Sequence, residues 1–351
     1  MDKIRAFLKR KDIVISARRY GIDALGAMAQ GLFCSLLIGT IINTCGTQFN
    51  LPFLNTIGDF ATKMSGPAMA IAIGYALHCP PLVLFSLATV GSAANGLGGA
   101  GGPLAVLIIA IIAAECGKAI SKETKIDLLV TPLVTIFIGV ALSALIAPAI
   151  GSAASSLGKL IMWATEQQPF VMGVVVSVVI GIALTLPISS AAICAALSLT
   201  GLAGGAAVAG CCAQMVGFAI MSFRENRWGG LISQGIGTSM LQMGNIVRNP
   251  RIWIPPTVAS AITGPLATCL FKLEMNGPAV SSGMGTCGLV GQIGVYTGWV
   301  NDVASGAKAA ITAMDWIGLI LICFILPALI SWALGLLLRK IGWIKENDLK
   351  L

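Results

Sequence analysis

Residues 128–150 read "LLVTPLVTIFIGVALSALIAPAI", a run without any charged side chain. A helix needs about 20 such residues to cross the hydrocarbon core of a bilayer. The chain is 56% hydrophobic and only 10% charged, with a mean hydropathy of +0.91. An integral membrane protein of the all-α class is therefore predicted, because helices pair their own backbone groups in lipid. Apolar runs recur at 25–43, 66–90, 170–198, 200–221, 252–271, 278–298 and 315–338.

One apolar run, at 104–117, is too short to span the membrane and follows the glycine-rich stretch "GLGGAGG" at 96–102. Irregular backbone is tolerated at membrane depth only where protein or a water-filled cavity covers it, as in a re-entrant hairpin. We predict about 8–10 transmembrane helices within residues 21–338, judged by the length that a span requires. Re-entrant hairpins are predicted near 90–117 and 229–247.

Basic residues gather at the two ends of the chain, in residues 1–20 and in the tail 339–351. Short cytoplasmic segments carry an excess of Lys and Arg, so both termini are predicted to be cytoplasmic. Residues 1–20 are interpreted as a basic, amphipathic interfacial segment whose partner is anionic membrane lipid. The net charge of +8 does not indicate a nucleic-acid partner, because the basic residues are scattered among juxtamembrane segments.

The ten cysteines lie mostly within apolar runs. Cysteine packs there as a small hydrophobic residue, and no CxxC-type spacing is present. Cys211 and Cys212 are adjacent, which suits neither a shared zinc ion nor an easy disulfide. The pattern predicts no metal site and no cofactor.

Four segments interrupt the apolar pattern with small and polar residues, at 90–105, 186–209, 235–256 and 274–294. Small residues allow transmembrane helices to pack closely, and this interpretation accounts for single glycines. Transporters also bind solutes where helices unwind near the bilayer midplane. Amides and hydroxyls clustered in the same segments favour this second interpretation: Asn95, Ser189, Ser190, Gln214 and Asn276.

Few ionisable residues interrupt the apolar runs, and each is a functional candidate because a charge in lipid costs several kcal/mol. Glu115 lies three residues before Lys118 and either pairs with it or serves a site. His78, the only histidine, precedes Pro80 and is either a helix-end residue or a proton carrier. Glu274 lies in "KLEMNGP", which suits a loop turn or a ligand site.

Residues 130–193 resemble the core of the membrane-embedded IIC subunits of the bacterial sugar phosphotransferase system. The resemblance rests on Pro132, the Ala147-Pro148 step, and Pro169 followed by a small-residue helix. The string "GIGTSMLQMGNIVRNPRIWIPP" at 235–256 resembles a later IIC motif at the tip of a re-entrant hairpin. Nearly the whole chain is similar to the divergent IIC-like family that includes perfringolysin O regulator-like membrane proteins.

This resemblance implies a helical fold with re-entrant hairpins, a homodimer in a bacterial plasma membrane, and separate cytoplasmic phosphocarrier subunits. It also implies a sugar or sugar-like ligand. Thr238 and Ser239 stand where sugar-transporting members have the hairpin glutamate. Ser189 and Ser190 stand in place of a histidine found after the helix that follows Pro169. No catalytic residue is therefore predicted, and it stays open whether phosphoryl transfer is retained.

Two functions follow from these residues. The first is a permease that binds a small polar solute at the midplane and moves it by alternating access. Loss of the carboxylate also suits an anionic solute, attracted by Arg248 and Arg251 unless these only mark topology. The second is a membrane-bound sensor or regulator that kept the fold without the transfer chemistry. The predicted solute-binding residues are Gly235, Gly237, Thr238, Ser239, Gln242 and Asn245 of the hairpin, facing Ser189, Ser190, Asn95 and Asn276.

Overall fold

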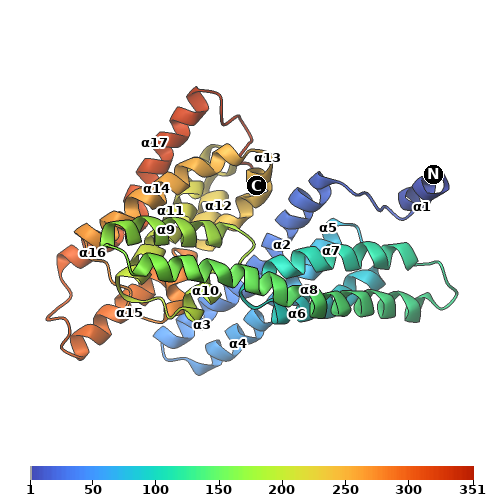
Figure 1. The fold of residues 1–351 in the computed structure, drawn as a ribbon, viewed down its shortest axis with the longest axis horizontal. Coiled ribbons are helices and arrows are strands. Elements are labelled where there is room, and N and C mark those ends of the chain that lie inside the picture. The colour runs from blue at the N-terminus through green and yellow to red at the C-terminus, as the bar shows by residue number, and fades with distance from the viewer. Residues whose placement is uncertain (1) are drawn as a thin grey trace. The chain divides into compact units, whose positions relative to one another are not determined.

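The structure is a computed structural model that describes residues 2–351, with the side chains of all except residues 2–5, 157–159, 162 and 196. The described chain is helical, with one isolated bridge between Gly201 and Met275 and no β-strand (Figure 1). The all-α prediction is confirmed. Within the described residues, five helical stretches are long and apolar enough to cross a membrane: Arg19–Gln48, Pro81–Ile120, Asp127–Ser156, Gly201–Met221 and Ala313–Lys340.

Several other predicted spans are divided by breaks in the backbone. The run 66–90 is interrupted between residues 77 and 80, where His78 has a φ of 56° and Pro80 precedes a new helix. The run 278–298 turns at Gly285, which has a φ of 54°. Proline and positive-φ residues end helices because they cannot continue the helical hydrogen-bond ladder without strain. Fewer long spans therefore form than hydropathy alone predicts.

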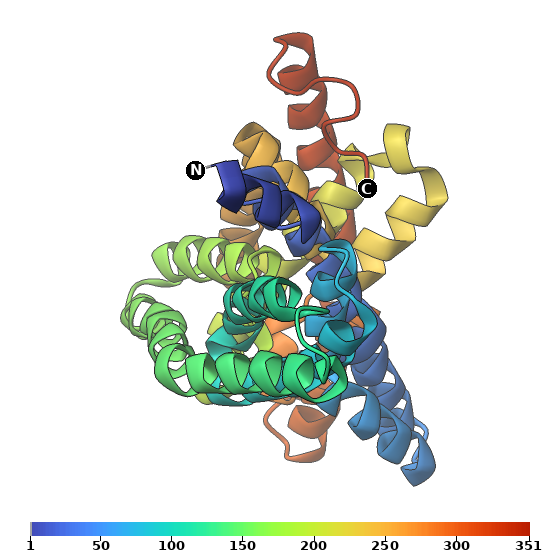
Figure 2. The same ribbon diagram turned by 90° about the vertical axis from the view of Figure 1, so that its right-hand side faces the viewer.

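The chain forms two compact units, residues 1–153 and 154–351. The long helix α8 (Asp127–Thr165) runs through the boundary between them. In the first unit, α3 and α4 lie side by side as a helical pair (Figure 2). The helices of this unit are α1 (Asp2–Arg10), η1 (Arg19–Ala24), α2 (Leu25–Leu32), η2 (Phe33–Leu37), α3 (Ile38–Gln48), α4 (Pro52–Lys63), α5 (Ser65–Ala76), α6 (Pro81–Gly98), η3 (Gly99–Gly101) and α7 (Gly102–Ile120).

The segment predicted as a hairpin near 90–117 is formed by α6 and α7 of the first unit. Gly99 has a φ of 50° and turns the chain between the two helices. Pro103 follows at the start of α7, where a missing N–H costs nothing. The two helices and the turn between them form a helix–turn–helix, and the re-entrant hairpin stays a prediction.

In the second unit, α11 (Gly201–Met221) is almost entirely buried. It packs against α9 (Pro169–Thr185), α14 (Ile254–Pro265) and α17 (Leu326–Lys340). A helix that is apolar on every face is expected at the centre of a membrane domain. The remaining helices of this unit are α10 (Ser190–Ala196), α12 (Phe223–Ile232), η4 (Ser233–Gly237), η5 (Ser239–Gln242), α13 (Met243–Arg248), η6 (Pro250–Trp253), η7 (Leu266–Leu270), η8 (Ala279–Gly283), η9 (Cys287–Leu289), α15 (Val290–Ala304), α16 (Ala313–Ile320) and η10 (Leu321–Ile325).

The hairpin predicted near 229–247 is a broken helix in the second unit. η4, which follows α12, ends at Gly237, and the next residue, Thr238, is extended with a φ of −158° and a ψ of 142°. The Thr238 hydroxyl accepts a hydrogen bond from the Met240 backbone N–H at 3.2 Å, and so caps η5. A threonine at this position satisfies a helix-start N–H that would otherwise have no partner. The sequence motif thus sets the break.

Candidate functional site

A buried network of hydroxyls and amides surrounds Gln214 on α11. The Gln214 Oε1 accepts hydrogen bonds from the Trp253 Nε1 at 2.9 Å and from the Thr185 hydroxyl at 3.4 Å. The Thr185 hydroxyl lies 2.8 Å from that of Ser239. Ser239, Thr185 and Gln214 are fully buried. Two predicted residues, Gln214 and Ser239, are therefore joined through Thr185.

Sequence reasoning missed the other members of this network, which are Thr185, Trp253, Thr257 and Ser260. The Gln214 Nε2 lies 3.4 Å from the hydroxyls of both Thr257 and Ser260. All four lie on helices that pack on α11, or on the turns that begin them. A signal was present only for Trp253, which belongs to the polar string at 235–256.

A second network joins three amide side chains of the hairpin. The Gln242 Nε2 donates to the Gln234 Oε1 at 2.8 Å, and the Asn245 Nδ2 donates to the Gln242 Oε1 at 2.8 Å. The Gln234 Nε2 in turn donates to the Ser222 hydroxyl at 2.7 Å. Gln234 and Gln242 are fully buried and Asn245 nearly so. A buried network is stable when each member finds its partners, and here the amide hydrogens all do.

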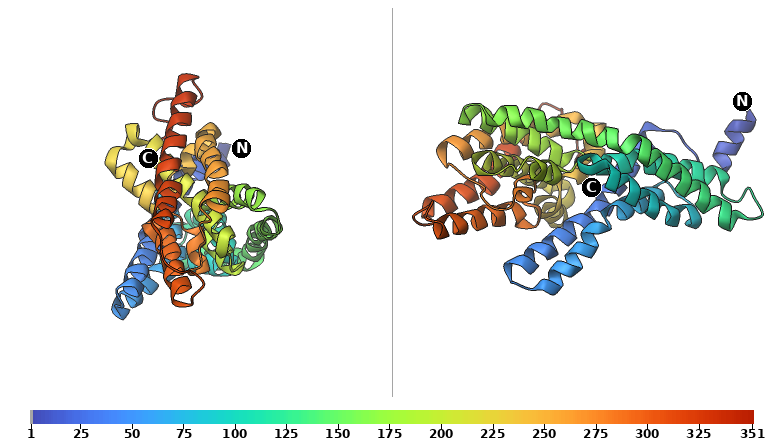
Figure 3. Two further views of the ribbon diagram at one scale, coloured as in Figure 1. Left: turned by 90° about the vertical axis from the view of Figure 1, so that its left-hand side faces the viewer. Right: turned by 60° about the horizontal axis from the view of Figure 1, so that its bottom comes forward.

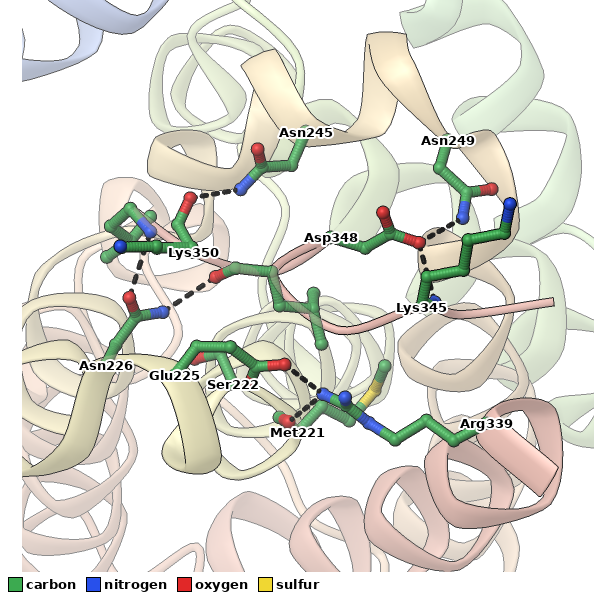
Figure 4. Close-up of polar contacts among 12 residues, drawn as sticks. Met221, Ser222, Glu225, Asn226, Asn245, Asn249, Arg339, Lys345, Asp348 and Lys350 are labelled. Carbon is green, nitrogen blue, oxygen red and sulfur yellow. Dashed lines mark hydrogen bonds and ion pairs between the residues drawn. The ribbon is translucent and has the colours of Figure 1, made fainter. Parts of the chain in front are cut away.

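The last residues of the chain complete this amide network. The Leu349 carbonyl accepts hydrogen bonds from Gln242 at 3.0 Å and from Asn226 at 2.7 Å. The Lys350 carbonyl accepts one from Asn245 at 2.9 Å. Figure 4 shows Asn226 and Asn245 directed toward this segment from opposite sides. Residues 341–351 therefore fold back on the hairpin, and the Leu349 side chain is fully buried.

Further contacts hold the tail at the end of α17. The Asn249 Nδ2 donates to the Asp348 carboxylate at 2.8 Å (Figure 4). It also donates to the Trp343 carbonyl at 2.9 Å. The Arg251 guanidinium lies over the Trp343 ring, 5.1 Å from its centre. Figure 3 shows the C-terminus beside α12. Arg251, predicted as a possible anion attractor, thus contacts the tail.

Two other predicted residues, Ser189 and Ser190, do not bond to the hairpin, whereas Gly235 and Gly237 belong to it. The Ser189 hydroxyl caps α10 by accepting from the Ala192 N–H at 3.2 Å. The Ser190 hydroxyl donates to the Gly283 carbonyl at 2.7 Å. Gly235 lines an apolar cavity of about 500 Å³, and Gly237 is buried at the end of η4. Ser189 and Ser190 were predicted to face the hairpin hydroxyls. In the described structure, neither forms a direct hydrogen bond with them.

Asn276 and Glu274 line a separate polar cavity of about 290 Å³. The Asn276 Nδ2 donates to the Asp302 carboxylate at 2.8 Å and to that of Glu274 at 3.2 Å. Lys308, which also lines the cavity, forms an ion pair with Asp315 at 2.6 Å. Asn276 and Glu274 are thus grouped with each other, as their shared segment suggested, and not with the hairpin.

The first unit contains the remaining predicted residues. The Asn95 Nδ2 donates to the Ser65 hydroxyl at 3.2 Å. Glu115 forms an ion pair with the buried Lys118 at 2.9 Å and accepts from the Tyr20 hydroxyl at 3.1 Å. The Lys118 Nζ also donates to the carbonyls of Asp12 and Leu77. Of the two interpretations of Glu115, the one in which it pairs with Lys118 agrees with this geometry.

His78 lies at the end of α5 in the first unit. Its ring is exposed, and Nδ1 is 3.3 Å from the Asp12 carboxylate. Asp12 also receives two hydrogen bonds from Arg19, at 2.6 and 3.1 Å. The hydrogen bonds from Arg19 lower the pKa of Asp12 from 3.8 to about 2. The contact between Asp12 and Arg19 joins the segment after α1 to the start of the first long helix.

Acid is therefore expected to weaken this contact. A carboxyl whose folded pKa lies below its unfolded pKa stabilises the fold above pH 4, and this contribution is lost as the pH falls toward 2. The effect should be small, because the Asp12 side chain is about half exposed. Thermal unfolding from pH 5 to 2 should show a shallower acid dependence for Asp12→Asn than for the wild type. Equal slopes would contradict the assignment.

Comparison with known proteins gives one informative result. No curated protein and no solved structure matches the chain. The family model described as "Phosphotransferase system, EIIC" matches residues 22–351, which include the tail and both segments predicted as hairpins. The chain therefore belongs to the EIIC family of the phosphotransferase system, a family of helical membrane proteins related to sugar transport, as the resemblance of residues 130–193 and 235–256 predicted.

Proposed function

We propose that this EIIC protein is a permease that binds a small, sugar-like solute at the hairpin and moves it by alternating access. The observation that carries the proposal is the set of neutral polar side chains buried around the broken helix at Thr238. Hydroxyls and amides can both donate and accept hydrogen bonds, which matches the hydroxyls of a polyol. Helix breaks of this kind bind solutes in other transporters.

The residues proposed to contact the solute belong to the two networks. Ser239 and Thr185 would bind from the Gln214 side, and Gln242 and Asn245 from the amide side. The amides now donate to backbone carbonyls of Leu349 and Lys350. A solute hydroxyl can replace a carbonyl as acceptor, so binding at Gln242 requires the tail to move. Solute and tail would then compete for the same donors.

This site is proposed to bind without covalent chemistry of its own. In the described structure, the side chains that bond to Ser239, Gln242 and Asn245 include no carboxylate and no histidine. Family membership implies a sugar substrate and phosphocarrier proteins as possible partners. Any phosphoryl group would reach the solute from such a partner. We further propose a homodimer in a bacterial plasma membrane with cytoplasmic termini, as the family and the distribution of basic residues suggest.

A sensor is the second candidate, and one observation favours it. The tail links the hairpin amides to the end of α17 through Asn226, Asn245 and Asn249. A solute that displaces the tail would therefore change the surface at the end of α17, where the tail is held. Such a change can signal to a partner without transport, as in other switches based on a bistable segment.

Replacement of Ser239 by alanine tests the permease. Loss of one buried hydroxyl partner is expected to weaken solute binding by about tenfold, since a buried hydrogen bond contributes about 1–1.5 kcal/mol. Binding of radiolabelled hexoses, hexitols and uronates to purified protein would be measured first, followed by uptake into proteoliposomes. Ser233→Ala is the matched control, because the Ser233 hydroxyl bonds only to the Gly230 carbonyl of its own helix.

The outcomes separate the two candidates. Binding together with uptake supports the permease, and binding without uptake supports the sensor. If Ser239→Ala and Ser233→Ala bind the solute equally well, the hairpin is not the site.

A further inference from the structure

Two adjoining cavities form one groove along α17 in the second unit. The first, of about 340 Å³, is lined by Arg224, Trp228, Trp332 and Arg339, among others. The second, of about 500 Å³, is lined only by apolar residues and glycine, with no polar side chain. Ile220 and Leu231 line both cavities, so the two are adjacent. We call this the α17 groove.

The length of the α17 groove matches one leaflet of a bilayer. Its apolar end begins at Phe324 and its basic end is at Arg339, on the continuous helical stretch formed by η10 and α17. These residues are roughly 22 Å apart along a helix axis. Half of the hydrocarbon core is roughly 15 Å thick, and a headgroup layer lies beyond it. The groove therefore has room for acyl chain at one end and headgroup at the other.

The basic end carries a cation without a protein partner. Arg339 is compensated, because its guanidinium lies 2.8 Å from the Glu225 carboxylate and both side chains are largely buried (Figure 4). Arg224 is exposed and forms no ion pair with any described residue of the chain. The positive charge available at the mouth of the groove is therefore that of Arg224.

Two tryptophans line the same cavity as this cation. Trp228 is 68% exposed and Trp332 is 52% exposed, and the Phe223 ring packs edge-on against that of Trp228 at 5.3 Å. Exposed tryptophans of membrane proteins concentrate at headgroup level. On α12 the chain order is Arg224, Trp228 and Leu231, and on α17 it is Arg339, Trp332 and Leu329. Both helices thus follow the order of headgroup, interface and acyl chain in a phospholipid.

From this order we infer that the α17 groove binds one phospholipid with an anionic headgroup. Its phosphate is held by Arg224, and one acyl chain lies between η4 and η10, against Ile236 and Leu329. An extended peptide does not fit the apolar part, because its backbone N–H groups would be left unpaired there. A sugar is excluded by the same argument. Basic pockets between transmembrane helices are known sites for anionic lipid headgroups.

Occupancy of the groove would act on the hairpin. Gly235 and Ile236 belong to the helical turn before the break at Thr238, and both line the apolar part of the groove. A bound acyl chain fills the space beside this turn and so favours the folded hairpin over alternatives. This inference rests on the membrane setting and the groove, and it does not depend on the proposed solute.

Native mass spectrometry of the purified protein tests the inference, with phosphatidylglycerol and phosphatidylcholine added in equal amounts. The wild type should retain one phosphatidylglycerol at least tenfold more often than one phosphatidylcholine. Arg224→Gln should abolish this preference, and Ala328→Phe, which fills the apolar part, should reduce retention of both lipids. Lys340→Gln is the charge-matched control, an exposed cation that does not line the groove.

A measurement on the wild type keeps the test independent of how the variants fold. Phosphatidylglycerol brominated on its acyl chain should quench tryptophan fluorescence more strongly than brominated phosphatidylcholine, and Trp332→Phe should lose most of this difference. Equal retention and equal quenching by the two lipids would overturn the proposal. It would also fail if inorganic phosphate alone raised the unfolding temperature as much as phosphatidylglycerol, since only an anion site would then be present.

Discussion

Replacement of Gln242 by leucine is expected to release the C-terminal tail and to lower the free energy of unfolding by about 2–4 kcal/mol, since each buried polar group left unpaired costs about 1–3 kcal/mol. Three groups lose a partner: the Gln234 Oε1, the Asn245 Nδ2 and the Leu349 carbonyl. The loss stays below the full sum because the released carbonyl can reach water. Thermal unfolding, together with trypsin cleavage after Lys345, measures both effects.

The control for this variant is Gln167→Leu. The Gln167 side chain donates only to the Trp163 carbonyl at the surface, at 3.3 Å, so its replacement should change neither stability nor cleavage. A Gln242→Leu protein whose tail resists trypsin as the wild type does would contradict the amide network as the anchor of the tail.

Truncation of residues 346–351 separates the two roles proposed for Gln242. If the tail competes with the solute, the truncated protein should bind solute more tightly, while Gln242→Leu should bind it less tightly. Both variants lose the tail contact, but only the truncation leaves the amides in place. Equal solute affinity in the wild type and in the truncated protein would mean that the tail does not compete for the site.

Replacement of Gly210 by alanine is expected to destabilise the second unit by about 3 kcal/mol, the upper end of what overpacking usually costs. A Cβ atom at Gly210 would lie 1.9 Å from the Ser177 carbonyl oxygen, which is backbone and cannot move aside alone. α9 and α11 would have to separate. The bond of the Ser177 hydroxyl to the Ser260 carbonyl, at 2.7 Å, would be strained as well.

The sign of this effect distinguishes packing from helix propensity. Alanine favours a helix over glycine by about 1 kcal/mol when nothing else changes. Gly229, on α12, has no atom within 4 Å of the position of a Cβ atom, so Gly229→Ala should be neutral or slightly stabilising. Thermal unfolding of the two variants in the same detergent makes the comparison. A Gly210→Ala protein as stable as Gly229→Ala would show that α9 and α11 are not packed this closely.

These contacts also bear on the two interpretations of the small-residue segments. At Gly205 a Cβ atom would lie 1.7 Å from the Leu273 carbonyl, so this glycine permits close packing. At Gly235 the nearest atom would be the Ala219 Cβ at 3.4 Å, an ordinary contact. Close packing explains Gly205 and Gly210 of α11, whereas Gly235 borders an open groove. The solute-binding interpretation stays a prediction.

The amino-acid sequence by itself determined the helical class, the membrane setting and the family. Hydropathy, proline and capping residues act through neighbours in the chain, so their effects can be predicted from local sequence. The partners of the polar side chains could not be predicted in this way. Gln242 bonds to Leu349, and Ser239 to Thr185, across long stretches of chain.

Only the tertiary structure decided that the tail completes the hairpin network and that Asn276 lies in a different cavity with Glu274. A buried amide must pair with whatever polar group the packing brings near it. That group is set by how helices cross and where the tail returns, and neither is encoded in the spacing of residues along one segment. The physical reason is that hydrogen bonds form between neighbours in space, while sequence patterns report only neighbours in the chain.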